Sequence, residues 1–491
     1  MFVALSFLYF ISPDSISQVY IKSDALSTSE GRIFNNSFQG YTKVYSQHTL
    51  ISKDVSFTIK RNIGDIKASN PVMFISNSSS LQKSVKENVT ATNYGGKIHS
   101  HSNGSVTQGL LGSLEDYKIF RRLKSTQVDC VRIIRQDRDY IEESRKLKYS
   151  SNLTNLLQNI SGNCREFIQK RNYIMSSLTL EEKEFPIAYS LLVYKHEEQV
   201  ERLLRAIYRP QNVYCIHIDD KANPKFTHII RNLSSCFDNV FITKRSVKVY
   251  WGYFSVLEPE LICMEELLKY KKWKYFINLT GQEFPLRTNS ELVKILKIYN
   301  GANDVEGTLK RADSGRWNVK KKPPHGITPV KGSIHITVNR QFVEYVIYNQ
   351  TAKDFLEWTR HVSVPDEVYF SSLNHNPHLK IPGSYTEVSE KDLEIKPFLT
   401  RFKSWFPDVP CQGMFIRTIC VFGVGDLPYL TKKPHLFINK FFLNLQPIAL
   451  DCMEEFHYNR TRDEFYNKFT FNTTFYEKLE FIKHTFRNVY T

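Results

Sequence analysis

The fold is decided by the stretch Ile187-Ala-Tyr-Ser-Leu-Leu-Val193, a run of mostly apolar residues without alternation. Such a run is typical of a strand that is buried on both faces of a parallel sheet. The apolar residues that follow have the spacing of an amphipathic helix: Val200, Leu203, Leu204 and Ile207. Pro210 should end this helix, so the stretch predicts a strand followed by a helix that packs on it.

The same pattern recurs along the next seventy residues. Further strands are expected at 213–218, 240–242 and 275–279, and further helices at 229–236 and 257–268. Repeated strand and helix units of this length predict an α/β fold with a doubly wound, largely parallel sheet. Ligands of such a sheet lie at the carboxyl ends of its strands. A helix is also expected from Cys130 towards Leu147.

The chain has 491 residues, of which 41% are hydrophobic, enough for one catalytic-size domain with an accessory region. Residues 1–12 are apolar but shorter than the roughly 20 residues that span a bilayer as a helix. They are interpreted as a truncated signal anchor or a signal peptide. Residues 13–126 are rich in Ser, Asn, Thr and Lys and read as a disordered, low-complexity stem.

The cysteines indicate an oxidising compartment. The chain has 8 of them, none in a CxxC pair, so four disulfides are favoured over a zinc site. Asn-X-Ser/Thr sequons, among them Asn35, Asn88 and Asn152, support the same compartment and a glycosylated protein.

The formal net charge of +16 does not by itself indicate nucleic acid. Basic residues are interleaved with acidic ones, apart from short clusters such as 320–322 and 432–433. A secreted or lumenal protein meets anionic membrane surfaces and acidic glycans more readily. No nucleic-acid partner is therefore expected.

Asp219-Asp220 ends the expected strand 213–218 and invites a metal-binding interpretation. Adjacent residues that leave a strand point in opposite directions, whereas a divalent metal needs carboxylates on one side. Asp219 fits better as an acceptor of hydrogen bonds from a uracil or ribose, with a simple turn as the alternative.

A possible phosphate site lies in the loop between Cys411 and Cys420, which carries Arg417, and at Lys440 further along. Arginine offers forked, permanently charged donors and lysine a point charge, so the two suit a diphosphate held without a metal ion. Two ordinary surface cations are the alternative.

The segment Ser363-Val-Pro-Asp-Glu367 precedes an expected helix at 368–373. Helix capping explains Asp366, but it explains Glu367 less well. A glutamate at a helix start facing a cleft can act as a general base on a sugar hydroxyl. Most tryptophans suit core packing, and Trp405 is the one that suits stacking on a sugar.

Taken together, these segments resemble the β-1,6-N-acetylglucosaminyltransferases of mucin core 2 and I-antigen branching, glycosyltransferase family 14. The resemblance covers about residues 125 to 456. Its landmarks, in order, are Phe185-Pro-Ile-Ala-Tyr-Ser190, Arg202-Leu-Leu-Arg-Ala-Ile-Tyr-Arg-Pro210, Trp273-Lys-Tyr-Phe-Ile-Asn-Leu279, Pro365-Asp-Glu367, the Cys411 to Cys420 loop, Phe422-Gly-Val-Gly-Asp-Leu427 and Asn439-Lys440.

The resemblance implies a Golgi type II membrane protein with a lumenal catalytic domain, a GT-A-like doubly wound mixed sheet, and inverting transfer without a divalent metal or other cofactor. It makes Glu367 the catalytic base, and it places Arg417 and Lys440 on the UDP diphosphate. Roles for five further residues follow from it in the same way. Asp219 and Trp251 would bind the donor nucleoside, and Glu306, Arg316 and Trp405 the acceptor.

The resemblance also implies the disulfides Cys130–Cys452, Cys164–Cys236, Cys215–Cys263 and Cys411–Cys420. It gives a catalytic domain at 127–456 and leaves 457–491 as a C-terminal extension. The chain departs from the family pattern at Thr280, where a free cysteine is common, and at Pro407, where a tyrosine is common. Lys310 is only a candidate for the family's acceptor-binding lysine.

The expected function is transfer of N-acetylglucosamine from UDP-GlcNAc to O6 of GalNAc on O-glycosylated glycoproteins, which forms core 2 branches. I-type branching on a galactose of polylactosamine is the second expectation, and xylose transfer to proteoglycan cores is a distant third. A glycan-binding protein that keeps the fold without turnover is the non-enzymatic alternative.

Overall fold

The structure, a computed structural model, describes residues 120–487 apart from 161, 311, 388–395 and 408–410. The described residues belong to the unit Ser100–Thr491, which is separate from the unit Met1–His99. The predicted anchor segment 1–12 and nearly all of the predicted stem 13–126 lie outside them. None of the helices seen between residues 120 and 487 is both long and apolar enough to cross a bilayer.

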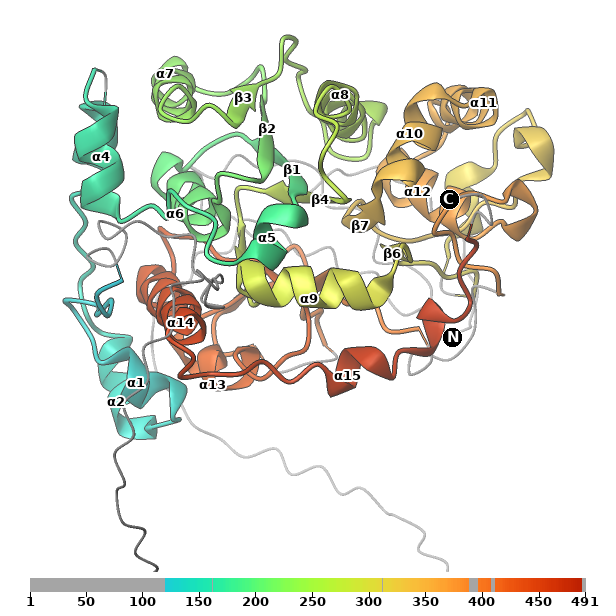
Figure 1. Cartoon of the computed structure of the whole chain (residues 1–491). Coiled ribbons are helices and arrows are strands. Elements are labelled where there is room, and N and C mark those ends of the chain that lie inside the picture. The colour runs from blue at the N-terminus through green and yellow to red at the C-terminus, as the bar shows by residue number, and fades with distance from the viewer. Residues whose placement is uncertain (1–119, 161, 311, 388–395, 408–410, 488–491) are drawn as a thin grey trace, which may run out of the picture. The chain divides into compact units, whose positions relative to one another are not determined.

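The centre of the fold is a six-stranded mixed sheet in the order β3-β2-β1-β4-β7-β6 (Figure 1). Strands β1 to β4 run parallel, whereas β7 is antiparallel to both of its neighbours. The strands are β1 Ile187–Val193, β2 Val213–Ile218, β3 Val240–Ile242, β4 Tyr275–Thr280, β6 Asp304–Val305 and β7 Ile336–Asn339. The four strands expected from the sequence are confirmed, and the antiparallel strand β7 makes the sheet mixed.

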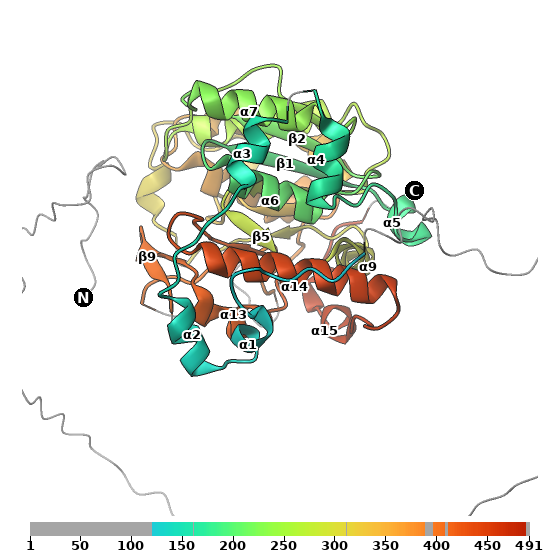
Figure 2. The ribbon, with the colours of Figure 1, turned by 90° about the vertical axis from the view of Figure 1, so that its left-hand side faces the viewer.

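Helices cover both faces of this sheet, which confirms the doubly wound α/β arrangement of the GT-A-like kind (Figures 1 and 2). One face packs on α6 Glu197–Ile207, α7 Pro224–Ser234 and α9 Asn289–Tyr299. The other packs on α8 Glu258–Leu267, α10 Arg340–Tyr348, α11 Gln350–Thr359 and α12 Tyr369–Asn374. Both faces of β1 are therefore buried, as its unbroken apolar run predicts.

A smaller layer carries the remaining strands. A three-stranded sheet has the order β5-β11-β8, and β9 and β10 form a separate antiparallel hairpin. These strands are β5 Glu283–Pro285, β8 Arg401–Phe402, β9 Met414–Ile416, β10 Ile419–Val421 and β11 Phe437–Asn439. Their core also contains residues of α1 Cys130–Ile134, α13 Leu427–Leu430 and α14 Pro447–Phe465.

The other helices are short. They are α2 Arg138–Ser144, α3 Leu153–Gln158, α4 Cys164–Arg171, α5 Leu180–Glu184 and α15 Thr474–Glu477, with 3-10 turns η2 Phe254–Val256, η3 Ser314–Trp317, η4 Pro324–Gly326, η5 Pro365–Glu367, η6 Pro377–Leu379, η7 Val424–Asp426 and η8 Glu480–Ile482. The prediction of a single helix from Cys130 to Leu147 is wrong, because the chain forms two helices there. The helical backbone breaks at Gln136, which has a φ of 67°, and Asp137 caps a new helix by accepting from the Tyr140 backbone N–H.

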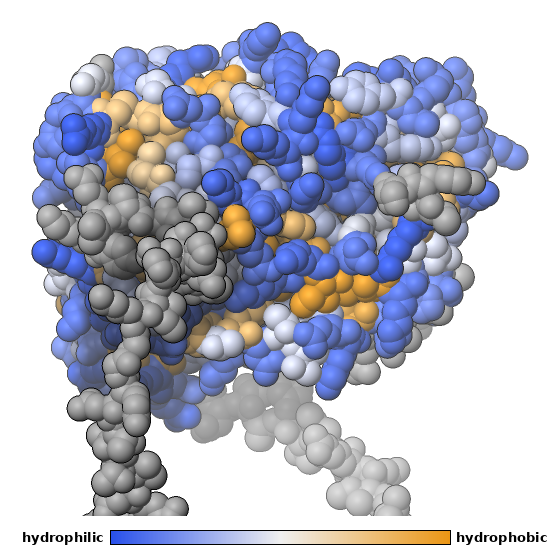
Figure 3. Space-filling view, viewed as in Figure 1, coloured by the Kyte–Doolittle hydropathy of each residue, from blue (hydrophilic) through white to orange (hydrophobic). Residues whose placement is uncertain are grey.

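Helix α14 crosses residue 456, where the extension was expected to begin. Beyond it, Tyr476 and Phe481 are buried in the same core as β1 and α9. In Figure 3 the face seen in Figure 1 is mostly hydrophilic, with an apolar patch near α9 and α15. The residues after 456 that the structure describes thus share the core of the sheet.

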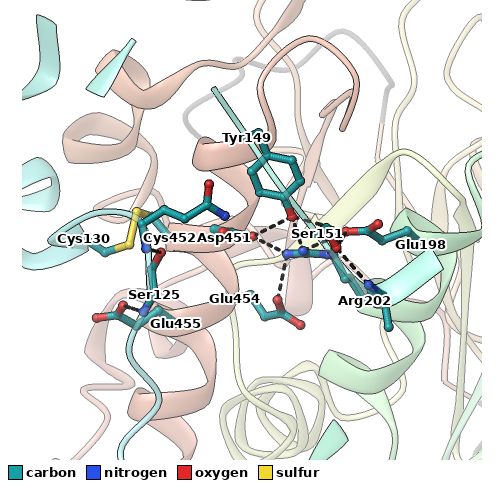
Figure 4. A network of polar contacts seen from close by, with 12 residues as sticks. Ser125, Cys130, Tyr149, Ser151, Glu198, Arg202, Asp451, Cys452, Glu454 and Glu455 are labelled. Carbon is teal, nitrogen blue, oxygen red and sulfur yellow. Dashed lines mark hydrogen bonds and ion pairs between the residues drawn. A yellow bond between two sulfur atoms is a disulfide. The ribbon is translucent and has the colours of Figure 1, made fainter. Parts of the chain in front are cut away.

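Helix α6 is tied to α14 by buried charges (Figure 4). The Arg202 guanidinium contacts Asp451 Oδ1 at 2.5 Å, Glu454 Oε2 at 2.9 Å and Glu198 Oε1 at 2.9 Å. Buried charges need such partners, because an unpaired one is costly to take from water. The Cys130–Cys452 disulfide fastens α1 to the same helix.

The structure joins the cysteines in the pairs that the resemblance implies. These are Cys130–Cys452, Cys164–Cys236, Cys215–Cys263 and Cys411–Cys420. All eight positions lie in the described part of the chain, and none is free.

Candidate active site

The predicted base, Glu367, lies in the turn η5 immediately before α12, and its side chain is 27% exposed. Its neighbour Asp366 makes no capping hydrogen bond, so the capping interpretation of Asp366 is wrong. Burial, together with the charge of Glu367, raises the pKa of Asp366 to about 7. Glu367 is therefore the exposed carboxylate of this pair.

Cations surround Glu367. Arg316 Nη1, from η3, lies 2.5 Å from Glu367 Oε2, and Lys331 Nζ lies 3.9 Å from the same oxygen. Burial lowers the pKa of Lys403, and the negative charges of Glu306 and Glu367 oppose this change. The fold thus brings Glu306 and Arg316, both predicted to bind the acceptor, into one charged cluster with Glu367.

Close backbone packing holds this cluster together at Gly332. The Gly332 N–H donates to Glu367 O at 2.7 Å. A Cβ at position 332 would lie 1.9 Å from Ser371 Oγ and 2.2 Å from Glu306 O, distances that no side chain can adopt. Glycine at this position therefore lets the segments of Glu306, Lys331 and Glu367 meet.

The predicted phosphate site is a pair of cations on two different elements. Arg417 is exposed at the turn between β9 and β10, where its φ is 51°. Lys440 follows β11, and its Nζ donates to Ile416 O at 3.3 Å, one residue before Arg417. Burial lowers the pKa of Lys440 to about 8, and the Arg417 charge adds to the effect. Two cations held this close suit an anionic ligand.

Neither cation forms an ion pair with a carboxylate in the part of the chain that the structure describes. A buried lysine without an acidic partner is uncommon, because the charge loses its water without gaining a counter-charge. We refer to Arg417 and Lys440 as the cation clamp. Its charge is available to a ligand.

Trp405 is attached to the clamp through the backbone. It forms a bridge with Ile419 of β10, and the next residue, Phe406, donates its N–H to Thr418 O at 2.9 Å. The indole is 43% exposed, as a sugar-stacking residue requires. Trp358, in contrast, is buried in the core.

Asp219 lies at the carboxyl end of β2 and is buried. Its Oδ1 accepts from the backbone N–H groups of Lys221 at 2.9 Å and Val249 at 3.4 Å. Asp220 instead points to solvent, 4.0 Å from Lys248. The two carboxylates thus occupy different environments. The loop that Asp219 holds carries Trp251, which is 71% exposed.

Within the described residues, Cys411, Cys420 and Asp426 have potential ligand atoms close enough together to hold a metal ion. The two sulfur atoms form a disulfide, so thiolate ligands are lacking there. A cavity of about 520 Å³ beside Tyr149, Ser151 and Asp451 contains none of the predicted site residues.

The structure therefore places the predicted residues in three groups. Glu306, Arg316 and Glu367 make the charged cluster, while Arg417, in the turn of the hairpin β9–β10, is joined there by Lys440 and Trp405, which contact the hairpin from other segments. Asp219 and Trp251 lie together at a third place, the end of β2. Sequence reasoning missed Lys331, which belongs to no motif, and Lys310 lies exposed in the segment between Glu306 and Arg316.

Comparison with known proteins gives a family match. The family model described as Core-2/I-Branching enzyme matches residues 187–430, which include Asp219, Glu306, Glu367 and Arg417. A cattle (Bos taurus) protein named beta-1,3-galactosyl-O-glycosyl-glycoprotein beta-1,6-N-acetylglucosaminyltransferase is 35% identical over 372 residues, 69% of this chain and 86% of that protein. The human (Homo sapiens) protein of the same name is 33% identical over 368 residues, covering 67% and 85%.

A zebrafish (Danio rerio) protein with the same name and the suffix 4 is 35% identical over 381 residues. The match covers 70% of this chain and 87% of that protein. The similarity thus extends over most of the length of each relative.

Proposed function

The chain belongs to the Core-2/I-branching enzyme family and is a glycosyltransferase, and from this premise we propose that it transfers N-acetylglucosamine from UDP-GlcNAc to O6 of GalNAc in O-linked glycans of glycoproteins. The product is a core 2 branch. Transfer inverts the anomeric centre and needs no divalent metal. The cation clamp carries this proposal, because it offers a leaving diphosphate two fixed positive charges.

The proposed reaction is a single displacement. The acceptor O6 attacks C1 of the donor sugar while the bond from C1 to the diphosphate oxygen breaks. Glu367 takes the proton of the O6 hydroxyl, a role that a partly exposed carboxylate can fill. The negative charge that develops on UDP is received by Arg417 and Lys440.

The donor nucleoside is proposed to bind at the end of β2. Asp219 holds the 247–253 loop through its Oδ1, and its other oxygen lies 3.4 Å from Lys221 Nζ. Trp251 on this loop is exposed enough to contact the uridine. Ligands of doubly wound sheets bind at such strand ends.

The acceptor is proposed to bind between Glu306, Arg316 and Trp405. Arg316 and Lys331 both contact Oε2 of Glu367, so an acceptor hydroxyl can donate to Oε1. The stacking face of Trp405 and the charges of the cluster can then orient the sugar ring. We place the protein in the Golgi membrane with this domain in the lumen, which suits its four disulfides.

A transfer assay with chelator tests this proposal. UDP-GlcNAc is offered with a core 1 disaccharide or with lactosamine in excess EDTA, and branched product is measured. We expect core 1 to be branched at a rate that EDTA changes less than twofold, since the clamp replaces a metal. No transfer to either acceptor would contradict the enzymatic proposal. Preference for lactosamine would redirect it to I-type branching, and loss of transfer with EDTA would contradict the metal-free step.

The clamp also predicts a pH dependence of UDP binding. Because the pKa of Lys440 is lowered to about 8, the free enzyme loses this charge as pH rises through 8. A bound diphosphate favours the protonated form, so UDP affinity is greatest below pH 8 and falls above it. We expect a decline approaching tenfold per pH unit above 8, measured by calorimetry. The same titration of Lys440→Arg should be flat to pH 10.

A further inference from the structure

A buried carboxylate, Glu283 of β5, has contacts that lead both to the cation clamp and to Lys403 of the charged cluster. Its side chain is fully buried. Burial alone would raise the pKa of Glu283, but the Arg401 charge and the His335 contact overcome this and hold the pKa at about 2. Glu283 is therefore a fixed negative charge within the protein.

One contact of Glu283 leads to the clamp. Glu283 Oε1 accepts from Asn439 Nδ2 at 3.0 Å, and Asn439 directly precedes Lys440. The residue after Lys440, Phe441, donates its N–H to Gln282 O at 2.8 Å. Lys440 is thus bracketed on both sides by contacts to residues 282 and 283. We call the contact through Asn439 the donor arm.

A second contact to the same Glu283 oxygen leads towards the acceptor region. His335 Nε2 lies 2.8 Å from Glu283 Oε1, and His335 Nδ1 lies 3.0 Å from Ser333 Oγ. Ser333 Oγ in turn accepts from Lys403 Nζ at 2.8 Å. The negative charges of Glu306 and Glu367 act on the pKa of Lys403 and oppose its lowering by burial. We call this chain of contacts the acceptor arm.

The protonation of the acceptor arm follows from burial. Burial and the Lys403 charge lower the pKa of His335 to about 4, so its imidazole is neutral at physiological pH. A neutral imidazole has one N–H, which the Glu283 carboxylate attracts to Nε2, leaving Nδ1 to accept from Ser333. The donors then run from Lys403 to Ser333 and from Ser333 to His335, and the last link is the 2.8 Å contact between His335 Nε2 and the Glu283 carboxylate.

We propose that Glu283 is a positioning residue shared by both halves of the active site, fixing Lys440 through Asn439 and Lys403 through His335 and Ser333. This inference rests on the proposed function. As a consequence, Lys440 at the leaving group and Lys403 in the charged cluster keep a fixed separation, because both are tied to one buried carboxylate.

A simpler role for Glu283 is to neutralise the buried Arg401. Arg401 Nε lies 3.6 Å from Glu283 Oε1, farther than either His335 or Asn439. Its Nη1 donates to Thr400 O at 2.7 Å, and its Nη2 donates to Asn278 O. Arg401 is therefore held largely by backbone carbonyls, and the test has to separate charge neutralisation from positioning.

Three conservative variants separate the two arms. Asn439→Ala cuts the donor arm, His335→Gln cuts the acceptor arm at Ser333, and Glu283→Gln weakens both. UDP affinity is measured by calorimetry, and acceptor kcat/KM is measured at saturating UDP-GlcNAc. His325→Gln, at an exposed histidine that pairs with Asp354, is the matched control. Thermal unfolding of each variant reports on folding.

We expect Asn439→Ala to weaken UDP binding about tenfold with acceptor KM unchanged, and His335→Gln to lower acceptor kcat/KM about tenfold with UDP affinity unchanged. Glu283→Gln should show both losses. In a Lys403→Met background, His335→Gln should have no further effect on acceptor kcat/KM, because its action passes through Lys403. A purely structural role would lower both parameters in every variant and would persist in the Lys403→Met background.

The proposal is overturned if His335→Gln weakens UDP binding as much as Asn439→Ala, or if a folded Glu283→Gln leaves both parameters unchanged. If Glu283→Gln does not fold, the two arm variants and the Lys403 background decide the question. If the wild type transfers no sugar, the proposed function fails separately. The UDP affinities then still test the positioning role of Glu283, because Asn439→Ala must weaken UDP binding and His335→Gln must not.

Discussion

Glu367→Gln is expected to lower kcat for sugar transfer by about 10² to 10⁴-fold, the range that a general base contributes. The amide keeps the size of the side chain and can still contact Arg316, but it cannot take the proton from the acceptor O6. UDP affinity should change less than twofold, because the clamp lies on other elements. Transfer is measured with the core 1 acceptor, and UDP binding by calorimetry.

Glu357→Gln is the matched control for this change. Glu357 is 71% exposed on α11, where it pairs only with the neighbouring Arg360, 3.0 Å away, among the described residues. Its replacement should leave kcat within twofold of the wild type. A normal kcat in Glu367→Gln would remove Glu367 from the role of base. A parallel loss of UDP affinity would instead indicate that the fold of the site is disturbed.

Arg417→Ala is expected to lower kcat by about 10² to 10³-fold, as removal of one preorganised transition-state donor does. UDP binding should also weaken, because in the proposed complex the arginine already contacts the diphosphate before transfer. Arg417→Lys should fall between the wild type and Arg417→Ala, since it keeps the charge and loses the forked donors. Lys440→Met should resemble Arg417→Ala.

Lys432→Met, at an exposed surface lysine, is the control for nonspecific charge effects. It should change neither kcat nor UDP affinity, because charges exposed to solvent are screened by salt. Unchanged UDP affinity in both Arg417→Ala and Lys440→Met would contradict the clamp. If Lys432→Met and Arg417→Ala both lower UDP affinity, and high salt abolishes the loss in both variants, the cause is general electrostatic attraction.

The parallel half of the fold could be predicted from the sequence, since β1, β2 and β4 are apolar runs of 7, 6 and 6 residues and the short β3 continues their alternation with helices. Strand β1 was expected at 187–193 and lies at Ile187–Val193. The antiparallel half could not be predicted in this way. Strand β6 has only the residues Asp304 and Val305, and β7 reads Ile-Thr-Val-Asn, too short for periodicity to indicate a strand.

The site shows a similar division. Arg417 and Lys440 could be proposed from residue type and the cysteine-bounded loop, and the fold places them beside each other. Lys331 and His335 could not, because their roles depend on which loops meet at Gly332 and β5. Capping was a reasonable explanation of Asp366 from spacing alone, but the left-handed backbone of Val364 (φ 53°) starts a 3-10 turn there instead.

The Cys130–Cys452 bridge has a consequence for synthesis of the chain. Its cysteines are 322 residues apart, so at 5 to 20 residues per second Cys130 waits roughly 15 to 65 s for its partner to be made. The other bridges, with separations of 72, 48 and 9 residues, can close sooner after their first cysteine is made. A chain that stops before residue 452 keeps an unpaired thiol at Cys130, which distinguishes an unfinished molecule from a finished one.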